Sequence, residues 1–318
     1  MGTTAGEPSL GVNWRTGNVL FGSDLQTLRV SFDDCSSPAR ATWKDVSAPT
    51  SVESLDPILF TDCKTGRTIV SQLLGVTNAS SFSDDDGATW TPGGVVATNA
   101  VDHQTVGGGV FSTNAFPITA TTAYTHAVYY CSQGIADASC SFSSNGGITY
   151  GPPVPMYTIL QCGGLHGHVK VDPNDGAVYV PNKSCGGTQG MAVSTNDGSS
   201  FTVVPITGST AGTWDPSIGI GSRSTIYFGY RNGDGHPHVA VLRNHGQQFI
   251  NDIDVGTSLG LQRIAFPEMV AGDDNRAAFA FLGTKTGGDD SLGNSINFEW
   301  LCWLLRTSGP CQAALVRW

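Results

Sequence analysis

One eight-residue pattern recurs along the chain and constrains its fold more than any other feature. Its clearest copies are 83–90, 143–150 and 194–201, and all three have the form Ser-x-Asp/Asn-x-Gly-x-Ser/Thr-aromatic. A split copy begins at Ser31 and a degenerate copy at Leu242, so successive copies start 52, 60, 51 and 48 residues apart. A repeat of roughly 40–50 residues built from short strands is typical of the blades of a β-propeller.

A second, fainter pattern lies between the octapeptides. An acidic residue or histidine comes first, often followed by Pro, and then come apolar residues, a polar turn and a β-branched run. Six copies occur, at 7–21, 56–70, 102–130, 166–180, 215–228 and 266–281. Each copy predicts a strand, a hairpin and a second strand. The octapeptide then joins a third strand to a fourth, and its Asp/Asn-x-Gly supplies the positive φ of a tight turn.

Six such units predict an all-β fold, a six-bladed β-propeller of four-stranded antiparallel blades. Because one family of repeats spans the chain, we expect 1–318 to form a single domain. The blades are expected at approximately 7–50, 51–98, 99–160, 161–210, 211–260 and 261–318. The last blade departs from the pattern, since no octapeptide follows Lys285. A turn at 308–310 is expected to close its final hairpin.

Composition excludes several kinds of partner. No segment approaches the roughly 20 apolar residues of a membrane-spanning helix, so no membrane partner is expected. The net charge is −10 and the sequence has no basic stripe, so nucleic acid is not expected either. Charged residues make up only 13% of the chain, which contains 41 glycines; both values suit a fold of many tight turns. We expect a monomer.

The eight cysteines have no C-x-x-C spacing, which argues against a zinc ribbon or a redox motif. They fall into local pairs that predict the disulfides Cys131–Cys140, Cys162–Cys185, Cys302–Cys311 and Cys35–Cys63. An even number of locally paired cysteines indicates an oxidising compartment. We therefore expect a secreted or periplasmic protein whose signal peptide precedes Met1 in the precursor.

The octapeptides match Ser-x-Asp-x-Gly-x-Thr-Trp, the Asp-box or bacterial neuraminidase repeat (BNR repeat). The chain therefore resembles the Asp-box propellers, a sialidase-like superfamily. The resemblance implies that the boxes are structural turns on the face away from the catalytic centre. Sialidases also carry a Phe/Tyr-Arg-Ile-Pro motif, whereas the nearest early arginine here is Arg29, with no proline after it. The resemblance thus supports the fold more strongly than the activity.

In a propeller, the innermost strand of each blade begins at the mouth of the central channel. Each of these strand starts carries an acidic residue or a histidine, and we expect them to gather there: Glu7, Asp56, Asp102, His103, His166, His168, Asp215 and Glu268. Crowded carboxylates repel each other unless a cation or protons intervene. The alternative is that the acids only cap backbone amides where the strands begin.

A divalent metal on the channel axis would explain this ring. Carboxylates favour Ca²⁺ and histidines favour Zn²⁺. The predicted metal ligands are Glu7, Asp56, Asp102 and His168. The predicted catalytic residues are His103, His166, Asp215 and Glu268.

Loops between the second and third strands should surround the same mouth. The predicted substrate contacts there are Tyr230, Arg231 and Lys183. The alternative for the polar, Gly-rich loop 230–238 is an ordinary solvated loop. Trp214, next to Asp215, either walls a pocket or fills the core.

The leading functional hypothesis is a secreted metal-dependent hydrolase of esters, lactones or phosphotriesters, in which the metal polarises the substrate or activates water. The first alternative is a sialidase-like glycoside hydrolase without a catalytic metal. The second is a non-catalytic carbohydrate-binding propeller. All three imply a small-molecule or glycan ligand.

Overall fold

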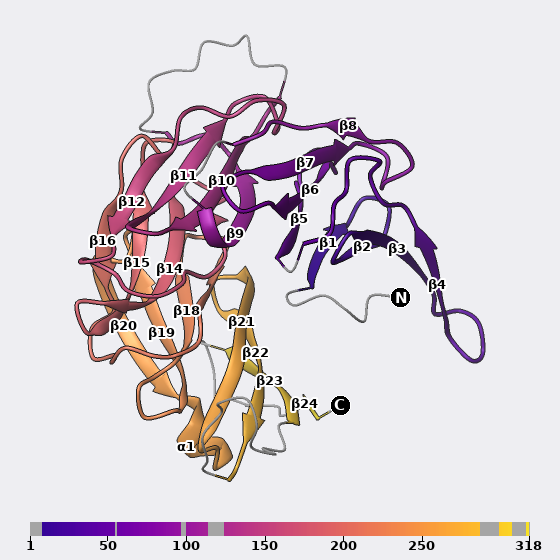
Figure 1. Cartoon of the computed structure of the whole chain (residues 1–318). Coiled ribbons are helices and arrows are strands. Elements are labelled where there is room, and N and C mark those ends of the chain that lie inside the picture. The colour runs from indigo at the N-terminus through magenta and orange to yellow at the C-terminus, as the bar shows by residue number, and fades with distance from the viewer. Residues whose placement is uncertain are drawn as a thin grey trace. The chain divides into compact units, whose positions relative to one another are not determined.

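The protein is a six-bladed β-propeller built almost entirely from short antiparallel strands (Figure 1). The computed structural model describes residues 8–54, 56–96, 100–113, 124–286, 299–306 and 316–317. Six four-stranded sheets are formed, and in each the strands pair in chain order. The single helix among these residues is α1 (Val255–Leu259). Each of the six predicted blade ranges contains one sheet, so the predicted fold class is confirmed.

The chain divides into two compact units. Unit 1 comprises Met1–Pro155 with Asn196–Ser200, and unit 2 comprises Met156–Thr195 with Phe201–Trp318. The sheets of unit 1 are β1 (Ser9–Asn13), β2 (Asn18–Ser23), β3 (Gln26–Asp33) and β4 (Arg40–Asp45); β5 (Pro57–Thr61), β6 (Thr68–Leu73), β7 (Asn78–Ser83) and β8 (Thr91–Pro92); and β9 (Ala100–Gly109), β10 (Ala127–Gly134), β11 (Asp137–Ser143) and β12 (Val154–Thr158), whose last residues belong to unit 2.

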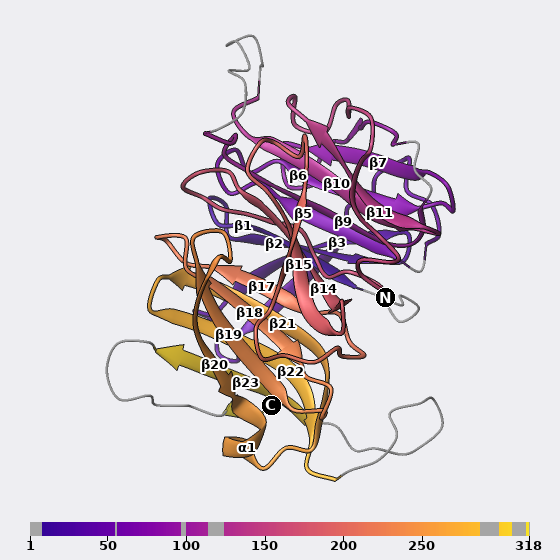
Figure 2. The same cartoon turned by 90° about the vertical axis from the view of Figure 1, so that its left-hand side faces the viewer.

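Unit 2 contains the other three sheets, of which the fifth and sixth are displayed in Figure 2. These sheets are β13 (Lys170–Val171), β14 (Val178–Cys185), β15 (Thr188–Ser194) and β16 (Thr202–Pro205); β17 (Ser217–Ile220), β18 (Ile226–Arg231), β19 (Pro237–Arg243) and β20 (Gln248–Asp254); and β21 (Arg263–Asp273), β22 (Arg276–Thr284), β23 (Glu299–Arg306) and β24 (Val316–Arg317). The predicted turn at 308–310 lies outside the described residues.

The octapeptides form the tight turns between the third and fourth strands. In the copy at 83–90, Ser83 Oγ accepts a hydrogen bond from the Gly87 amide at 2.8 Å. The Asp85 carboxylate accepts from the amide and the hydroxyl of Thr89, at 2.8 and 2.7 Å. The turn repeats at Asn145 and Asn196, whose Oδ1 atoms accept from the backbone amide four residues later. The predicted role of the octapeptide is therefore confirmed.

The core of each unit lies between the faces of neighbouring sheets. Tyr227 of β18 packs with Phe279 and Phe281 of β22, and all three side chains are fully buried. Between the first and second sheets, the Trp90 indole donates to the Val46 carbonyl at 2.6 Å. The closing aromatic of this octapeptide thus bridges adjacent blades.

Two of the four predicted disulfides are formed, Cys131–Cys140 and Cys162–Cys185. The predicted Cys35–Cys63 bridge is wrong, because both residues are exposed free cysteines. Cys35 lies between β3 and β4 of the first sheet, and Cys63 lies between β5 and β6 of the second sheet. Cys302 lies on β23, and its predicted partner Cys311 lies outside the described residues. Among the described helices, none is long and apolar enough to cross a membrane.

Candidate functional site

The predicted ring residues divide between the two units. Unit 1 holds Asp56, Asp102 and His103, and unit 2 holds His166, His168, Asp215 and Glu268. Glu7, a predicted metal ligand, lies outside the described residues. The surroundings of the two groups differ.

In unit 1, the two acids bind backbone amides. The Asp56 carboxylate accepts from the Gln104 amide at 2.8 Å, and the Asp102 carboxylate accepts from the His103 amide at 2.9 Å. His103 is the extra residue of a β-bulge, because Asp102 pairs with Gln133 and Gln104 with Ser132. Its φ is +48° and its side chain is buried. This arrangement matches the capping alternative for these acids.

In unit 2, two acids pair with lysines instead. Lys183 Nζ lies 2.8 Å from Asp215 Oδ1, and both side chains are largely buried. Lys170 Nζ lies 3.6 Å from Glu268 Oε1 in a more exposed position. These ammonium groups compensate the charges of Asp215 and Glu268, two of the predicted catalytic residues.

The charges of these ion pairs act on two histidines of unit 2, His166 and His168. His166 is fully buried, and its Nδ1 lies 2.9 Å from the Gly167 carbonyl. Burial is the main cause that lowers the pKa of His166 to about 4, and the charge of Lys183 adds to it. Burial also lowers the pKa of His168, although the nearby Glu268 opposes that shift. Both imidazoles are therefore neutral at pH 7.

Lys183 owes its position to a bulge in β14. Asn182 pairs with Gly190, whereas Cys185 pairs with Thr188, so Lys183 and Ser184 together lie opposite one residue. The Lys183 carbonyl accepts from the Gly212 amide at 2.9 Å, which attaches the segment before Trp214 and Asp215 to this bulge. Bulges commonly redirect a side chain next to a functional site.

A second bulge in unit 2 places an aromatic residue. Ala265 pairs with Leu282 and Glu268 with Ala280, so Phe266 and Pro267 form the irregularity in β21. Phe266 has a φ of +51°, although its side chain is bulky, and it is 53% exposed. Its ring centroid lies 4.3 Å from that of Trp214, which is itself partly exposed. Trp214 directly precedes Asp215 in the chain, and on this basis we call Trp214, Phe266, Lys183 and Asp215 the aromatic–ionic site.

Phe266 is not among the site residues predicted from the sequence. The sixth sequence repeat begins at Phe266, but the inner strand was predicted to begin at Glu268. The strand begins at Arg263 instead, because the bulge lets pairing with β22 continue upstream of Phe266. The Phe-Pro step was the available signal, since a residue before proline often lies at a break in regular pairing.

Other predicted contacts are buried. Tyr230 has no exposed surface, and its hydroxyl donates to Asp252 Oδ2 at 3.0 Å. Arg231 is also buried, and its carbonyl accepts from the Gln189 side chain at 3.0 Å. Lys183 is therefore the predicted substrate contact that lies in the aromatic–ionic site.

A metal centre needs at least three converging ligands. Within the described ranges, no group of three His, Cys, Asp or Glu side chains is arranged to hold a metal ion. His168 is partly exposed beside Glu268, the acid that pairs with Lys170. The predicted Ca²⁺ or Zn²⁺ ligation remains a prediction.

No family model matches the chain, and no curated protein matches it. The chain is similar in structure to a protein of unknown function from Dyadobacter fermentans, with 14% identity, a TM-score of 0.52 and 94% of each chain covered. It is also similar to the Aleuria aurantia lectin in complex with Fucα1-6GlcNAc, with 10% identity, a TM-score of 0.54 and coverage of 98% of this chain and 95% of the lectin.

A third similar structure is the GH74 enzyme of Niastella koreensis, with 14% identity and a TM-score of 0.61. The match covers 96% of this chain but only 45% of that enzyme. At such low identities, these similarities show the propeller fold alone.

Proposed function

We propose that this protein binds carbohydrate at the aromatic–ionic site of unit 2. The observation that carries the proposal is the conformation of Phe266. A bulky residue with a positive φ costs on the order of 1–3 kcal/mol, and such strain is concentrated at functional sites. Here the strained residue presents a half-exposed ring against Trp214 instead of filling the core.

The site has the chemical groups that a sugar requires. The C–H face of a pyranose packs on aromatic rings, which offer large apolar area at a low cost in conformational entropy. The Asp215 carboxylate accepts hydrogen bonds from sugar hydroxyls and the Lys183 ammonium donates to them. Hydrogen bonds to charged groups are stronger than those between neutral groups. The fixed 2.8 Å separation of Lys183 Nζ and Asp215 Oδ1 places both functions side by side.

Two of the similar structures support this ligand class. One similar structure is a lectin in complex with a fucosylated disaccharide, and another is a GH74 enzyme. A glycan was also among the ligands expected from the sequence. The two disulfides support the further proposal that the protein is secreted or periplasmic.

Hydrolysis is the second candidate, and the neutral His168 favours it. His168 is partly exposed and lies within electrostatic range of Glu268, so its unprotonated imidazole can accept a proton as a general base. A metal-dependent ester, lactone or phosphotriester hydrolase would also need a bound ion. Assays of these substrates and of sialosides, before and after chelation, test this candidate.

The binding proposal is tested with a glycan array, followed by calorimetric titration of Fucα1-6GlcNAc and of the glycan that the array retains best. Trp214→Ala and Phe266→Ala should each weaken binding at least tenfold, about 1.4 kcal/mol, because each removes stacking area. Trp43→Ala is the matched control. Trp43 is 49% exposed in unit 1 and packs edge-on against Phe21 at 6.1 Å, so its removal should leave affinity unchanged.

Equal losses in all three variants would show that any exposed aromatic residue supports binding, and would contradict this site. Unchanged affinity in both Trp214→Ala and Phe266→Ala would do the same. Absence of binding to every glycan would remove the proposal itself.

A further inference from the structure

The segment that leads into the fourth sheet is held against β14 by few backbone contacts. Gly163 donates to the Ser184 carbonyl at 2.7 Å, Gly167 to the Pro181 carbonyl at 2.8 Å, and the Gly186 amide to the Gln161 carbonyl at 3.2 Å. Single bridges join Cys162 with Cys185 and His166 with Asn182. The regular inner strand that follows, β13, has only two residues. Segment 161–167, which contains His166, is therefore paired with β14 by isolated hydrogen bonds and single bridges, without a continuous strand pairing.

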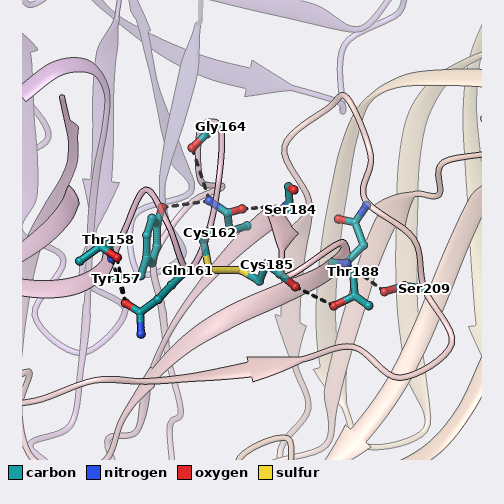
Figure 3. The surroundings of a disulfide bond; sticks show 11 residues. Tyr157, Thr158, Gln161, Cys162, Gly164, Ser184, Cys185, Thr188 and Ser209 are labelled. Carbon is teal, nitrogen blue, oxygen red and sulfur yellow. Dashed lines mark hydrogen bonds between the residues drawn. A yellow bond between two sulfur atoms is a disulfide. The ribbon is translucent and has the colours of Figure 1, made fainter. Parts of the chain in front are cut away.

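A disulfide reinforces this ladder at its upstream end. Cys162 bonds to Cys185, and both residues are buried. Figure 3 shows the bond beside the hydrogen bonds of its neighbours: Asn182 Nδ2 donates to the Tyr157 hydroxyl at 3.0 Å, and the Thr158 amide donates to Gln161 Oε1 at 3.0 Å. Cys185 directly follows Lys183 and Ser184, the two residues at which β14 bulges.

Gly164 connects this disulfide to the aromatic–ionic site. A Cβ atom on Gly164 would lie 2.5 Å from Lys183 Cε, so the lysine side chain rests directly on the backbone of Gly164. Gly164 also has a φ of +76°, which favours glycine. Because Cys162 lies two residues upstream, the disulfide restrains the surface on which Lys183 lies and hence the pairing of Lys183 with Asp215.

We infer that the Cys162–Cys185 disulfide is a positioning element of the proposed carbohydrate site, and that it fixes the places of Lys183 and His166. The predicted effect on ligand affinity rests on the proposed function. Ligand affinity then depends on whether the Cys162–Cys185 bond is oxidised or reduced.

The other disulfide among the described residues provides the comparison. Cys131 and Cys140 lie directly opposite each other on β10 and β11, within an unbroken register of six residue pairs. That bond joins strands that are already fully paired, and it lies in unit 1. It should contribute to stability without affecting the aromatic–ionic site.

The experiment compares the double variant Cys162→Ser/Cys185→Ser with Cys131→Ser/Cys140→Ser. Affinity for Fucα1-6GlcNAc, or for the glycan that the array retains best, should fall at least tenfold in the first variant and stay within twofold in the second. NMR titration of the histidines supplies a readout that needs no ligand. In the first variant, the pKa of His166 should rise from about 4 toward its ordinary value of 6.5, because the loosened segment admits water.

Each outcome decides one question. An unchanged His166 pKa and unchanged affinity in the first variant would overturn the inference, as would equal changes in both variants. If the wild type binds no glycan, the proposed function fails, but the His166 titration still tests the positioning role. If the first variant does not fold, Gly164→Ala replaces it; this change displaces Lys183 with the disulfide intact, and wild-type affinity there would also overturn the inference.

Discussion

Two inner strands contain the same backbone irregularity and use it in opposite ways. β9 bulges at His103 and β21 bulges at Phe266, and both residues have a positive φ, +48° and +51°. His103 is only 5% exposed, whereas Phe266 is 53% exposed. The bulge itself therefore does not make a site; its neighbours decide whether the extra residue points inward or outward.

The residues that follow the two bulges explain part of this difference. Gln104 follows His103, and its amide and side chain bind Asp56 and Ser71, which ties the bulge to the neighbouring sheet. Pro267 follows Phe266 and has no amide hydrogen to satisfy. Phe266 instead packs on Trp214, which has Asp215 next to it in the chain.

The two units also differ in their balance of acidic and basic residues. Unit 1 has fourteen acidic residues (Asp and Glu) and six basic residues (Lys and Arg). Unit 2 has twelve acidic and ten basic residues. No lysine or arginine occurs between Arg67 and Lys170. Ring carboxylates in unit 1 therefore bind backbone amides, and those in unit 2 find ammonium partners. This difference makes the ionic half of the site specific to unit 2.

Substitutions of two glycines, one on β9 and one just before β13, should have the largest effect on stability. A Cβ on Gly167 would lie 1.9 Å from the Pro216 carbonyl oxygen, and one on Gly108 would lie 2.5 Å from that of Ala127. Gly167→Ala should lower the free energy of unfolding by about 3 kcal/mol or more and Gly108→Ala by about 2, because overpacking against backbone cannot relax. Chemical denaturation measures both. Gly163→Ala, with no atom within 4 Å, is the control and should be nearly neutral.

Acid should weaken unit 2 through His166. The folded-state pKa of about 4 lies below the unfolded value of 6.5, so the unfolded state binds the proton first and stability falls as the pH drops from 6.5 to 4. The expected slope is at most about 1.4 kcal/mol per pH unit, and His166→Gln should flatten it in urea titrations.

His238 is the matched control for this slope, because its pKa shift has the opposite sign. Burial lowers its pKa, but the hydrogen bond to Asp252 and the charges of Asp252, Asp254 and Asp234 together outweigh burial and raise the pKa overall. Its contribution is complete below pH 6.5 and is lost as the pH rises through the folded-state value. His238→Gln should therefore leave the acid slope intact. A flattened acid slope in this variant would contradict the assignment to His166.

The opposite orientations of the two bulge residues predict opposite phenotypes. Phe266→Ala should weaken glycan binding at least tenfold and change stability little, because its ring is half exposed. His103→Ala should lower stability by about 1–2 kcal/mol and leave affinity unchanged, because it removes a buried side chain. Calorimetric titration and thermal unfolding of the same two proteins measure both quantities. Loss of binding in His103→Ala would break the comparison between the bulges.

The smallest expected effect concerns the exposed ion pair between Lys170 and Glu268. Lys170 helps to lower the pKa of His168, so Lys170→Gln should raise that pKa at low salt. NMR titration measures the shift, which should disappear in 0.5 M salt. Lys44→Gln, on the fully exposed β4 of unit 1, should leave the pKa of His168 unchanged.

Two tripeptides of the form Asn-x-Ser show the limit of local motifs. Asn78-Ala79-Ser80 and Asn182-Lys183-Ser184 both match a glycosylation pattern. Both asparagines are buried, and their side-chain amides bond to Ser71 and Tyr157 respectively. Neither offers an accessible amide to a modifying enzyme. A three-residue pattern carries no information on burial.

The sequence by itself determined the number of blades, the turns and two of the disulfides. These features depend on contacts within one blade, and the Ser83–Gly87 and Asp85–Thr89 bonds are made by residues four apart. Only the tertiary structure decided that Asp56 caps an amide, that Asp215 pairs with Lys183 and that Phe266 faces Trp214. Those partners lie between 32 and 52 residues apart, and the bulges that orient them shift the alternation of side chains by one residue. A two-residue periodicity cannot reveal such a shift, because the bulge exists only when a second strand defines the register.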